Sequence, residues 1–137
     1  MANAPAIYDA SKITTTVANK IVSGYKKGTF VTANKDEPNV AVESNAQGEA
    51  SFSLNKSSLG TIVITLNQTS PWNKIFNGYA NKNEFFDIWV DDPINKERRG
   101  GTQGFVEKIA DATFSDGVEA RAYTIKVGDF SVTNYEK

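Results

Sequence analysis

The fold of this chain is decided by the stretch Leu59-Gly-Thr-Ile-Val-Ile-Thr-Leu-Asn-Gln-Thr-Ser-Pro-Trp-Asn-Lys-Ile-Phe-Asn-Gly-Tyr79, in which a strand leads directly into a helix. In its first part, Ile62, Ile64 and Leu66 alternate with threonine, valine and asparagine. This period of two is typical of a strand with one buried face. We therefore expect a strand here that contributes to the core.

The second part of the stretch predicts a short helix over about residues 71–80. Ser70 is a favourable N-cap residue, and Pro71 suits the first helical position, where its missing N–H costs nothing. Apolar residues then recur at the spacing of one helix face: Trp72, Ile75, Phe76 and Tyr79. We expect this face to pack against the β core.

The composition is that of one folded domain. The chain has 137 residues, of which 39% are hydrophobic and 23% charged, and we expect residues 1–137 to form a single domain. No run approaches the roughly 20 apolar residues of a membrane-spanning helix. The N-terminus lacks the basic and apolar regions of a signal peptide, and residues 1–10 are expected to form a flexible arm.

The chain contains neither histidine nor cysteine. Their absence removes disulfides, thiolate chemistry and the commonest metal ligands and general bases. Chemistry based on carboxylates alone, as in glycoside hydrolysis, remains open. The net charge of −1 favours no polyanionic partner. We expect no cofactor, no metal ion and no catalytic constellation.

Strand signals run through the rest of the chain and predict about eight antiparallel strands in all. Besides the strand above, the expected segments are 13–18, 21–23, 30–33, 85–90, 102–106, 109–114, 120–127 and the region around Phe130 and Val132. Tight turns are expected at Asn19-Lys20 and over 115–118, and a longer polar turn over 91–101. The pattern predicts a mainly β fold, an antiparallel β-sandwich or open barrel, whose one helix covers a sheet edge or one end of the barrel.

Residues 34–58 differ from the rest because they are long, polar and poor in core residues. Apolar residues alternate with polar ones on both sides of a turn signal over 45–49. The segment predicts either a long two-stranded arm that contacts other copies or a mobile loop. On the first interpretation, the self-assembly interface comprises Val40, Val42, Glu43, Gln47, Glu49, Phe52, Leu54 and Lys56.

Charge is unevenly spread along the chain. Residues 1–34 carry an excess of three positive charges, and residues 35–50 carry an excess of three negative charges. Two interpretations stay open: ordinary solvated surface, or patches of opposite sign that meet between copies of the chain.

A few short motifs have a chemical and a structural interpretation. Asp91-Asp92 is a carboxylate pair of the kind that binds metals, but no partner motif accompanies it, which favours a solvated turn. Arg98-Arg99 is able to hold a phosphate or carboxylate, although a basic pair at a hairpin tip is commonly solvated. Trp72 and Trp89 are able to stack on sugars. For Trp72 the helix face favours core packing, whereas Trp89 is either exposed or in contact with another subunit.

Several stretches together resemble the family of tube proteins of contractile phage tails. They are Tyr8-Asp9, Gly24-Tyr-Lys-Lys-Gly-Thr-Phe-Val-Thr32, Gly48-Glu-Ala50, Gly60-Thr-Ile-Val-Ile-Thr-Leu-Asn-Gln-Thr-Ser-Pro71 and Ala122-Tyr-Thr-Ile-Lys-Val-Gly-Asp129. The strand followed by Thr-Ser-Pro and a helix is the most specific of them, and it is also similar to the tube proteins of bacterial type VI secretion.

The resemblance implies a structural virion protein that forms hexameric rings stacked into the inner tube of a contractile tail. Implied partners are other copies of the chain, the tail sheath protein, a tape-measure protein in the lumen, baseplate and tail terminator proteins, and DNA in passage during genome ejection. It implies synthesis in the host bacterial cytoplasm and no membrane anchor. A tailocin or other contractile injection system is an alternative. From other classes, a β-sandwich adhesin or carbohydrate-binding module using Trp89 and Tyr79, or a carboxylate glycosidase, remains open.

Overall fold

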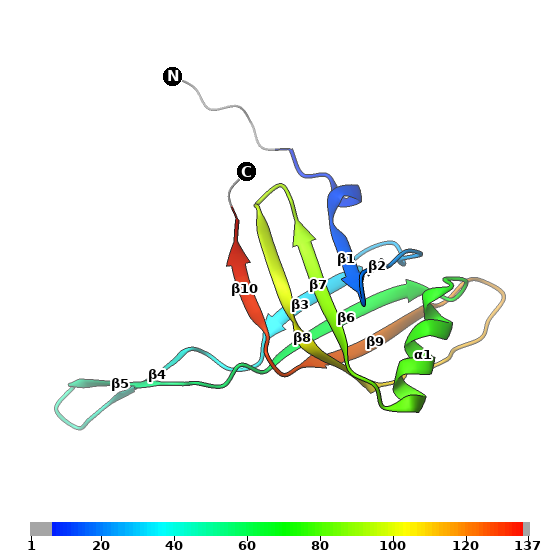
Figure 1. The fold of residues 1–137 in the computed structure, drawn as a ribbon. Coiled ribbons are helices and arrows are strands. Elements are labelled where there is room, and N and C mark those ends of the chain that lie inside the picture. The colour runs from blue at the N-terminus through cyan, green and yellow to red at the C-terminus, as the bar shows by residue number, and fades with distance from the viewer. Residues whose placement is uncertain (1–6, 136–137) are drawn as a thin grey trace, which may run out of the picture.

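The computed structural model describes residues 7–135, which form a mainly β structure with antiparallel strand pairing (Figure 1). The elements are η1 (Ala10–Lys12), β1 (Thr14–Val17), β2 (Lys20–Ile21), β3 (Val31–Lys35), β4 (Val40–Ser44), β5 (Ala50–Leu54), β6 (Gly60–Asn67), α1 (Trp72–Lys82), β7 (Phe86–Asp92), β8 (Glu97–Lys108), β9 (Ala120–Val127) and β10 (Ser131–Asn134). The expected fold class, a mainly antiparallel β fold with a short α-helix, is confirmed. Most of the expected N-terminal arm, residues 1–6, lies outside the described residues.

Two layers of strands share the long strand β8. The order β2-β1-β7-β8-β9-β6-β3 runs through both layers, and β10 also pairs with β8. Residues 97–100 of β8 lie between β7 and β10, whereas residues 104–108 pair with β9. In Figure 1, β1, β7, β10 and the first part of β8 form one layer, and they cross β3, β6 and β9 of the other layer. A strand that passes from one sheet to the other in this way forms the corner of a crossed β-sandwich.

The corner of β8 is built from glycines and one carboxylate. Gly100 has a φ of +144°, and a Cβ on it would collide with the backbone of Ile88, so only glycine fits there. The carboxylate of Asp129 accepts hydrogen bonds from the Thr102 N–H at 2.9 Å, the Thr102 hydroxyl at 2.6 Å and the Gln103 N–H at 2.9 Å. These bonds tie the turn between β9 and β10 to the corner.

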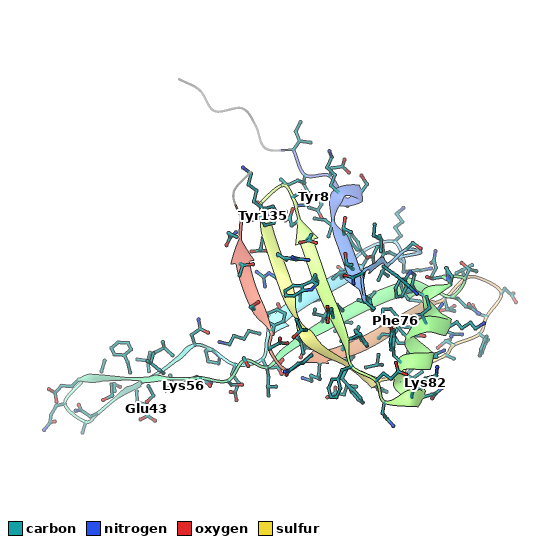
Figure 2. The ribbon with its side chains drawn as sticks, viewed as in Figure 1. Tyr8, Glu43, Lys56, Phe76, Lys82 and Tyr135 are labelled. Carbon is teal, nitrogen blue, oxygen red and sulfur yellow. The ribbon has the colours of Figure 1, made fainter. Side chains whose placement is uncertain are left out.

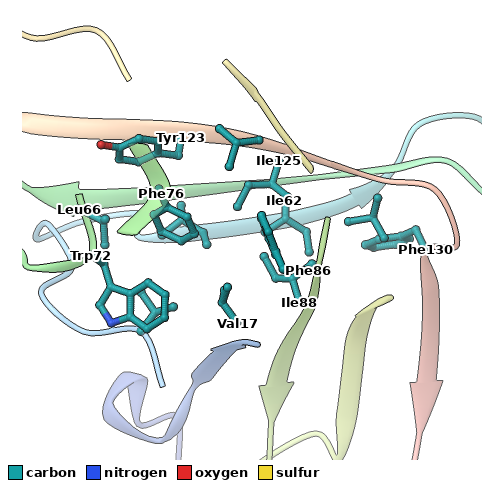
Figure 3. Close-up of a cluster of buried hydrophobic side chains, with 14 residues drawn as sticks. Val17, Ile62, Leu66, Trp72, Phe76, Phe86, Ile88, Tyr123, Ile125 and Phe130 are labelled. Atoms are coloured by element: carbon teal, nitrogen blue, oxygen red, sulfur yellow. The ribbon is translucent and has the colours of Figure 1, made fainter. Parts of the chain in front are cut away.

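The core lies between the two layers (Figure 3). The expected alternation is confirmed in β6, because Ile62, Ile64 and Leu66 are all completely buried. The same face of β9 contributes Tyr123 and Ile125, each opposite an isoleucine of β6 in the register. These two strands therefore form the floor on which the helix packs.

Helix α1 packs on this core through its aromatic face. Phe76 is completely buried and its ring centroid lies 5.1 Å from that of Tyr123. Trp72 is 5% exposed and donates from Nε1 to the Ile21 carbonyl at 3.1 Å. Ile75 and Tyr79 are half-buried and pack against the same cluster. The predicted face thus packs on the core, with Trp72 and Phe76 buried and Ile75 and Tyr79 covered only in part.

The helix boundaries differ slightly from those expected. The helix runs over Trp72–Lys82, longer than 71–80, and its N-cap is Pro71 rather than Ser70. The Ser70 hydroxyl still accepts a hydrogen bond from the Trp72 N–H at 3.2 Å, and it donates to the Ser23 carbonyl at 2.7 Å. Asn83 ends the helix in the left-handed conformation, which asparagine tolerates well.

Three expectations about turns and strands are wrong. The first hairpin turns at Ala18-Asn19, which both have positive φ, rather than at Asn19-Lys20; this places a two-residue turn between the paired strands. The expected polar turn over 91–101 shrinks to residues 93–96, because β8 already begins at Glu97. Residues 109–114 form no strand, because nothing in β8 or β9 pairs with them.

We predict that Phe76→Ala lowers the free energy of unfolding by about 3–5 kcal/mol, because it removes a fully buried ring from the centre of the core. Denaturant unfolding measures the change. Phe114→Ala is the matched control: its ring is 74% exposed, so the loss there is expected to stay below about 0.5 kcal/mol. Equal losses in the two variants would contradict the packing described for α1.

We predict that Asp129→Asn destabilises the protein by about 1 kcal/mol at neutral pH. Burial alone would raise the pKa of Asp129, but the hydrogen bonds from Thr102 and Gln103 outweigh it and hold the pKa below its ordinary value of 3.8. The ionised carboxylate therefore stabilises the fold at pH values above 3.8. This stabilisation is lost as the pH falls through the lowered pKa of Asp129. The difference between variant and wild type is expected to shrink in acid. Asp116→Asn, in an exposed bend, is the control, and a pH-independent difference would contradict the account.

Candidate self-assembly surface

Strands β4 and β5 form a two-stranded hairpin that projects away from the rest of the structure (Figure 1). The register pairs Val40 with Leu54 and Val42 with Phe52. Because directly opposite residues of a ladder lie on the same face, all four side chains share one face of the hairpin. We call these four residues the apolar hairpin face. Val42 is 60%, Phe52 70% and Leu54 78% exposed, and only Val40, at the hairpin base, is half-buried. Most of this face is therefore uncovered in the described chain.

The remaining residues of the expected interface lie elsewhere on the hairpin. Glu43 is paired with Ser51 on the opposite, polar face. Gln47 and Glu49 belong to the turn, where their N–H groups both donate to the Asn45 side-chain oxygen at 2.9 Å. Lys56 follows the hairpin and is exposed, as Figure 2 shows. The predicted set therefore comprises the apolar face, Glu43 on the polar face, two turn residues, and a lysine beyond the hairpin.

A polar cluster fixes the base of the hairpin to the sandwich. The Asp36 carboxylate accepts a hydrogen bond from the Thr61 hydroxyl at 2.5 Å. It also forms an ion pair with Lys126 at 3.1 Å. These two partners, Thr61 first, lower the pKa of Asp36. Nearby, the Asn55 N–H donates to the Asn39 carbonyl at 2.8 Å. The base is thus ordered by contacts of the subunit itself, whereas Val42, Phe52 and Leu54 of the apolar hairpin face stay exposed.

The sandwich also has outer strands whose backbone groups face away from it. Strand β3 ends one layer. The Phe30 carbonyl accepts from Thr65 and the Asp36 N–H donates to Leu59, so by alternation the backbone groups of residues 31, 33 and 35 point outward. Arg99 covers the Ala33 carbonyl with a 2.9 Å hydrogen bond. Strand β10 lies at the edge of the other layer, and within residues 7–135 it pairs with β8 alone. Such edges invite pairing with another chain.

The arginine pair lies inside β8 and not at a hairpin tip, which corrects the expectation. Arg98 forms an ion pair with Asp91 at 3.2 Å and lies over the Trp89 ring at 4.4 Å from its centroid. Arg99 pairs with Glu97 at 3.0 Å. Both guanidinium groups therefore have partners within the subunit, and one of them covers the tryptophan.

The residues considered for sugar binding or metal binding are not brought together. Tyr79 packs against Phe86 with ring centroids 4.7 Å apart. Phe86 and Trp89 lie on opposite faces of β7, so Tyr79 and Trp89 do not form one stacking platform. Asp92 is occupied as an acceptor from the Ile94 N–H at 3.1 Å. Within the described part of the chain, no group of three or more histidine, cysteine, aspartate or glutamate residues is placed to hold a metal ion.

A second exposed apolar surface was not predicted from the sequence. Phe85 and Phe105 lie with ring centroids 5.4 Å apart, and Leu59 and Val127 help to line the same open groove of about 340 Å³. We call it the Phe85–Phe105 groove. Its residues come from separate segments, so no local pattern reveals it; the only signal in the sequence is that Phe85 precedes a core phenylalanine and must face outward.

The comparisons with known proteins concern the fold alone. No protein-family model and no curated protein matches the chain. Among solved structures, a chain of the virion of a native gene transfer agent particle is similar with a TM-score of 0.68 and 11% identity, over 93% of this chain and 99% of that one. The cap of the anti-feeding prophage, a tube-terminating cap, is similar with a TM-score of 0.67 and 11% identity, over 98% of this chain and 96% of that one. A chain of the sheath–tube complex of the extracellular contractile injection system PVC is similar with a TM-score of 0.63 and 10% identity, over 93% of this chain and 91% of that one. The chain therefore has the fold found in components of contractile injection systems and of a virion.

Proposed function

We propose that this protein is a structural subunit of a contractile tail, and that it assembles into hexameric rings stacked into the inner tube. The observation that carries the proposal is the projecting hairpin with its uncovered apolar face. Exposed apolar patches on a hairpin are unfavourable in a monomer and are typical of a surface that another chain covers. The shared fold with tube-associated proteins supports the same role.

The outer strands give a physical reason for ring formation. Strand β3 and strand β10 lie at edges of different layers of the sandwich. Contact between different surfaces of identical subunits is head-to-tail, and it closes into a ring when the rotation between subunits allows it. Strands of neighbouring subunits would then join into one barrel around a channel.

The proposed partners follow from this role. Other copies of the chain build the rings and the stack, a sheath protein surrounds the tube, and a tape-measure protein occupies its lumen. Baseplate and terminator proteins bind its two ends, and DNA passes through it without specific contacts. The protein is then a non-enzymatic component of a virion, made in the cytoplasm of a host bacterium. In the described residues, α1 is the longest helix, and it is neither long nor apolar enough to cross a membrane.

A second candidate is a subunit that ends the tube instead of building it. The observation in its favour is the similarity to the anti-feeding prophage cap, which covers nearly all of both chains. A cap and a tube subunit differ in what they do alone: a cap closes into a ring that does not stack on itself. The tube of a tailocin or another contractile injection system involves the same subunit behaviour as a phage tube.

We predict that the purified protein forms rings and stacked tubes as its concentration rises. Sedimentation velocity over a concentration series, with negative-stain microscopy of the same samples, measures this. Rings that never stack would favour the cap. A protein that stays monomeric at every concentration and salt would contradict the proposed function.

We predict that replacing residues 43–53 by a short Gly-Ser linker leaves the fold intact and abolishes tube growth. The sandwich should keep its stability, because the apolar hairpin face makes no contact with the core. Circular dichroism and thermal unfolding check the fold, and microscopy checks the tubes. A shortened variant that still forms normal tubes would refute the assigned role of the hairpin.

We also predict that Glu43→Lys and Glu49→Lys together slow polymerisation, because the acidic hairpin then repels the positively charged surface that it meets. Light scattering measures the rate. The effect should weaken as salt rises, since both carboxylates are exposed and salt screens such charges. Reversal of the exposed Glu107 is the matched control and should leave the rate unchanged.

A further inference from the structure

The apolar hairpin face needs a surface of similar character on its partner, and the subunit itself carries one. The Phe85–Phe105 groove begins at Leu59, just beyond β5, and ends at Phe85, just beyond α1. Phe85 is 69% exposed and Leu59 is 52% exposed. Phe105 lies opposite Lys126 in the register of β8 and β9, on the outer side of that layer. The groove is thus an exposed apolar surface built on a rigid sheet.

The hairpin and helix α1, which ends close to the groove, carry charges of opposite sign. Residues 40–54 contain Glu43 and Glu49 and no lysine or arginine. Helix α1 contains Lys74 and Lys82, both exposed, and no aspartate or glutamate. Lys82 lies in the last turn of the helix, three residues before Phe85, with the exposed Glu84 between them. A second lysine, Lys126, lines the groove itself and pairs with Asp36. Charge complementarity therefore favours one orientation, with the acidic tip of the hairpin toward α1.

The spacing of the groups agrees with this orientation. Glu49 precedes Phe52 by three residues, about 10 Å along an extended strand. When Phe52 lies against the phenylalanine pair and the hairpin tip points toward α1, Glu49 extends beyond the groove to the end of that helix. Lys82 occupies that end.

The hairpin does not fill the groove of its own subunit. Figure 2 shows Glu43 on the projecting hairpin and Lys82 at the far side of the molecule. The polar cluster of Asp36, Thr61 and Lys126 holds the hairpin base in this direction. A hairpin that fills this groove would therefore have to come from another molecule.

We propose that the Phe85–Phe105 groove receives the apolar hairpin face of a second copy of this chain, with Glu49 of that copy beside Lys82. The assignment rests on the proposed function, self-assembly, and names the surface that the hairpin meets. Because the hairpin and the groove are different surfaces, each subunit gives one hairpin and receives another. Such a contact is head-to-tail and propagates from copy to copy.

Disulfide cross-linking tests the contact directly, because the chain contains no cysteine of its own. Val42→Cys, a nearly isosteric change on the apolar hairpin face, is mixed in equal amounts with Phe105→Cys or Phe85→Cys, assembled and oxidised. A disulfide requires Cβ atoms about 4 Å apart, so only true neighbours react. The control partner is Phe114→Cys, which replaces a phenylalanine that is 74% exposed but lies outside the groove.

The expected result is a cross-linked dimer on a non-reducing gel with the groove variants and none with Phe114→Cys. Assemblies that form normally but give no cross-link at either groove position would overturn the groove assignment and leave the proposed function standing. Cross-linking to Phe114→Cys alone would overturn it as well. A wild-type protein that never assembles would instead overturn the proposed function, and the groove assignment with it.

Charge exchange provides a second test that does not alter the apolar surfaces. Lys82→Glu and Glu49→Lys should each slow assembly by about 3- to 10-fold at low salt, and a variant carrying both changes should recover most of the wild-type rate. Lys108→Glu, at an exposed lysine that pairs with Asp111, is the control and should behave like wild type. If the combined variant is slower than either single variant, Glu49 and Lys82 do not meet.

Discussion

The structure depends on the passage of β8 from one layer of the sandwich to the other. Its first part lies between β7 and β10, and its last part lies beside β9. Gly100 permits the bend, and the Asp129 carboxylate holds it through hydrogen bonds to Thr102 and Gln103. Because of this corner, the two layers pack face to face and enclose the core side chains of β6 and β9. Helix α1 packs against the same core. The same strand carries Phe105 to the outside, so the corner also builds one wall of the groove.

Two exposed apolar surfaces remain after the core has formed, and their energies explain why assembly would be cooperative. Complete burial of a side chain such as Phe52 contributes about 1.5–3 kcal/mol. Association costs an estimated 4–15 kcal/mol in lost freedom of motion. The apolar hairpin face by itself therefore gives only weak pairing. A subunit inside a ring or stack combines this contact with strand pairing at its edges, and the cost of association is then divided among several contacts.

Local patterns were sufficient wherever one segment determines its own structure. The alternation of Ile62, Ile64 and Leu66 predicted β6, and the turn signal between two short apolar runs predicted the hairpin.

The prediction failed where the decisive partner is distant in sequence. The Gly100-Gly101 run was interpreted as a turn, yet the glycines are needed for close packing inside a strand. Residues 109–114 have strand-like composition but no neighbouring strand. The groove escaped notice because Leu59, Phe85 and Phe105 meet only in three dimensions.

The central claim is that another copy of the chain covers the apolar hairpin face. Hydroxyl-radical footprinting read out by mass spectrometry measures it most directly, by comparing the oxidation rate of Phe52 in dilute monomer and in concentrated assemblies. Phe114, which is exposed to a similar degree, serves as the internal reference. The account predicts that Phe52 becomes strongly protected on assembly relative to Phe114. Assemblies in which Phe52 is oxidised as fast as in the monomer would contradict it.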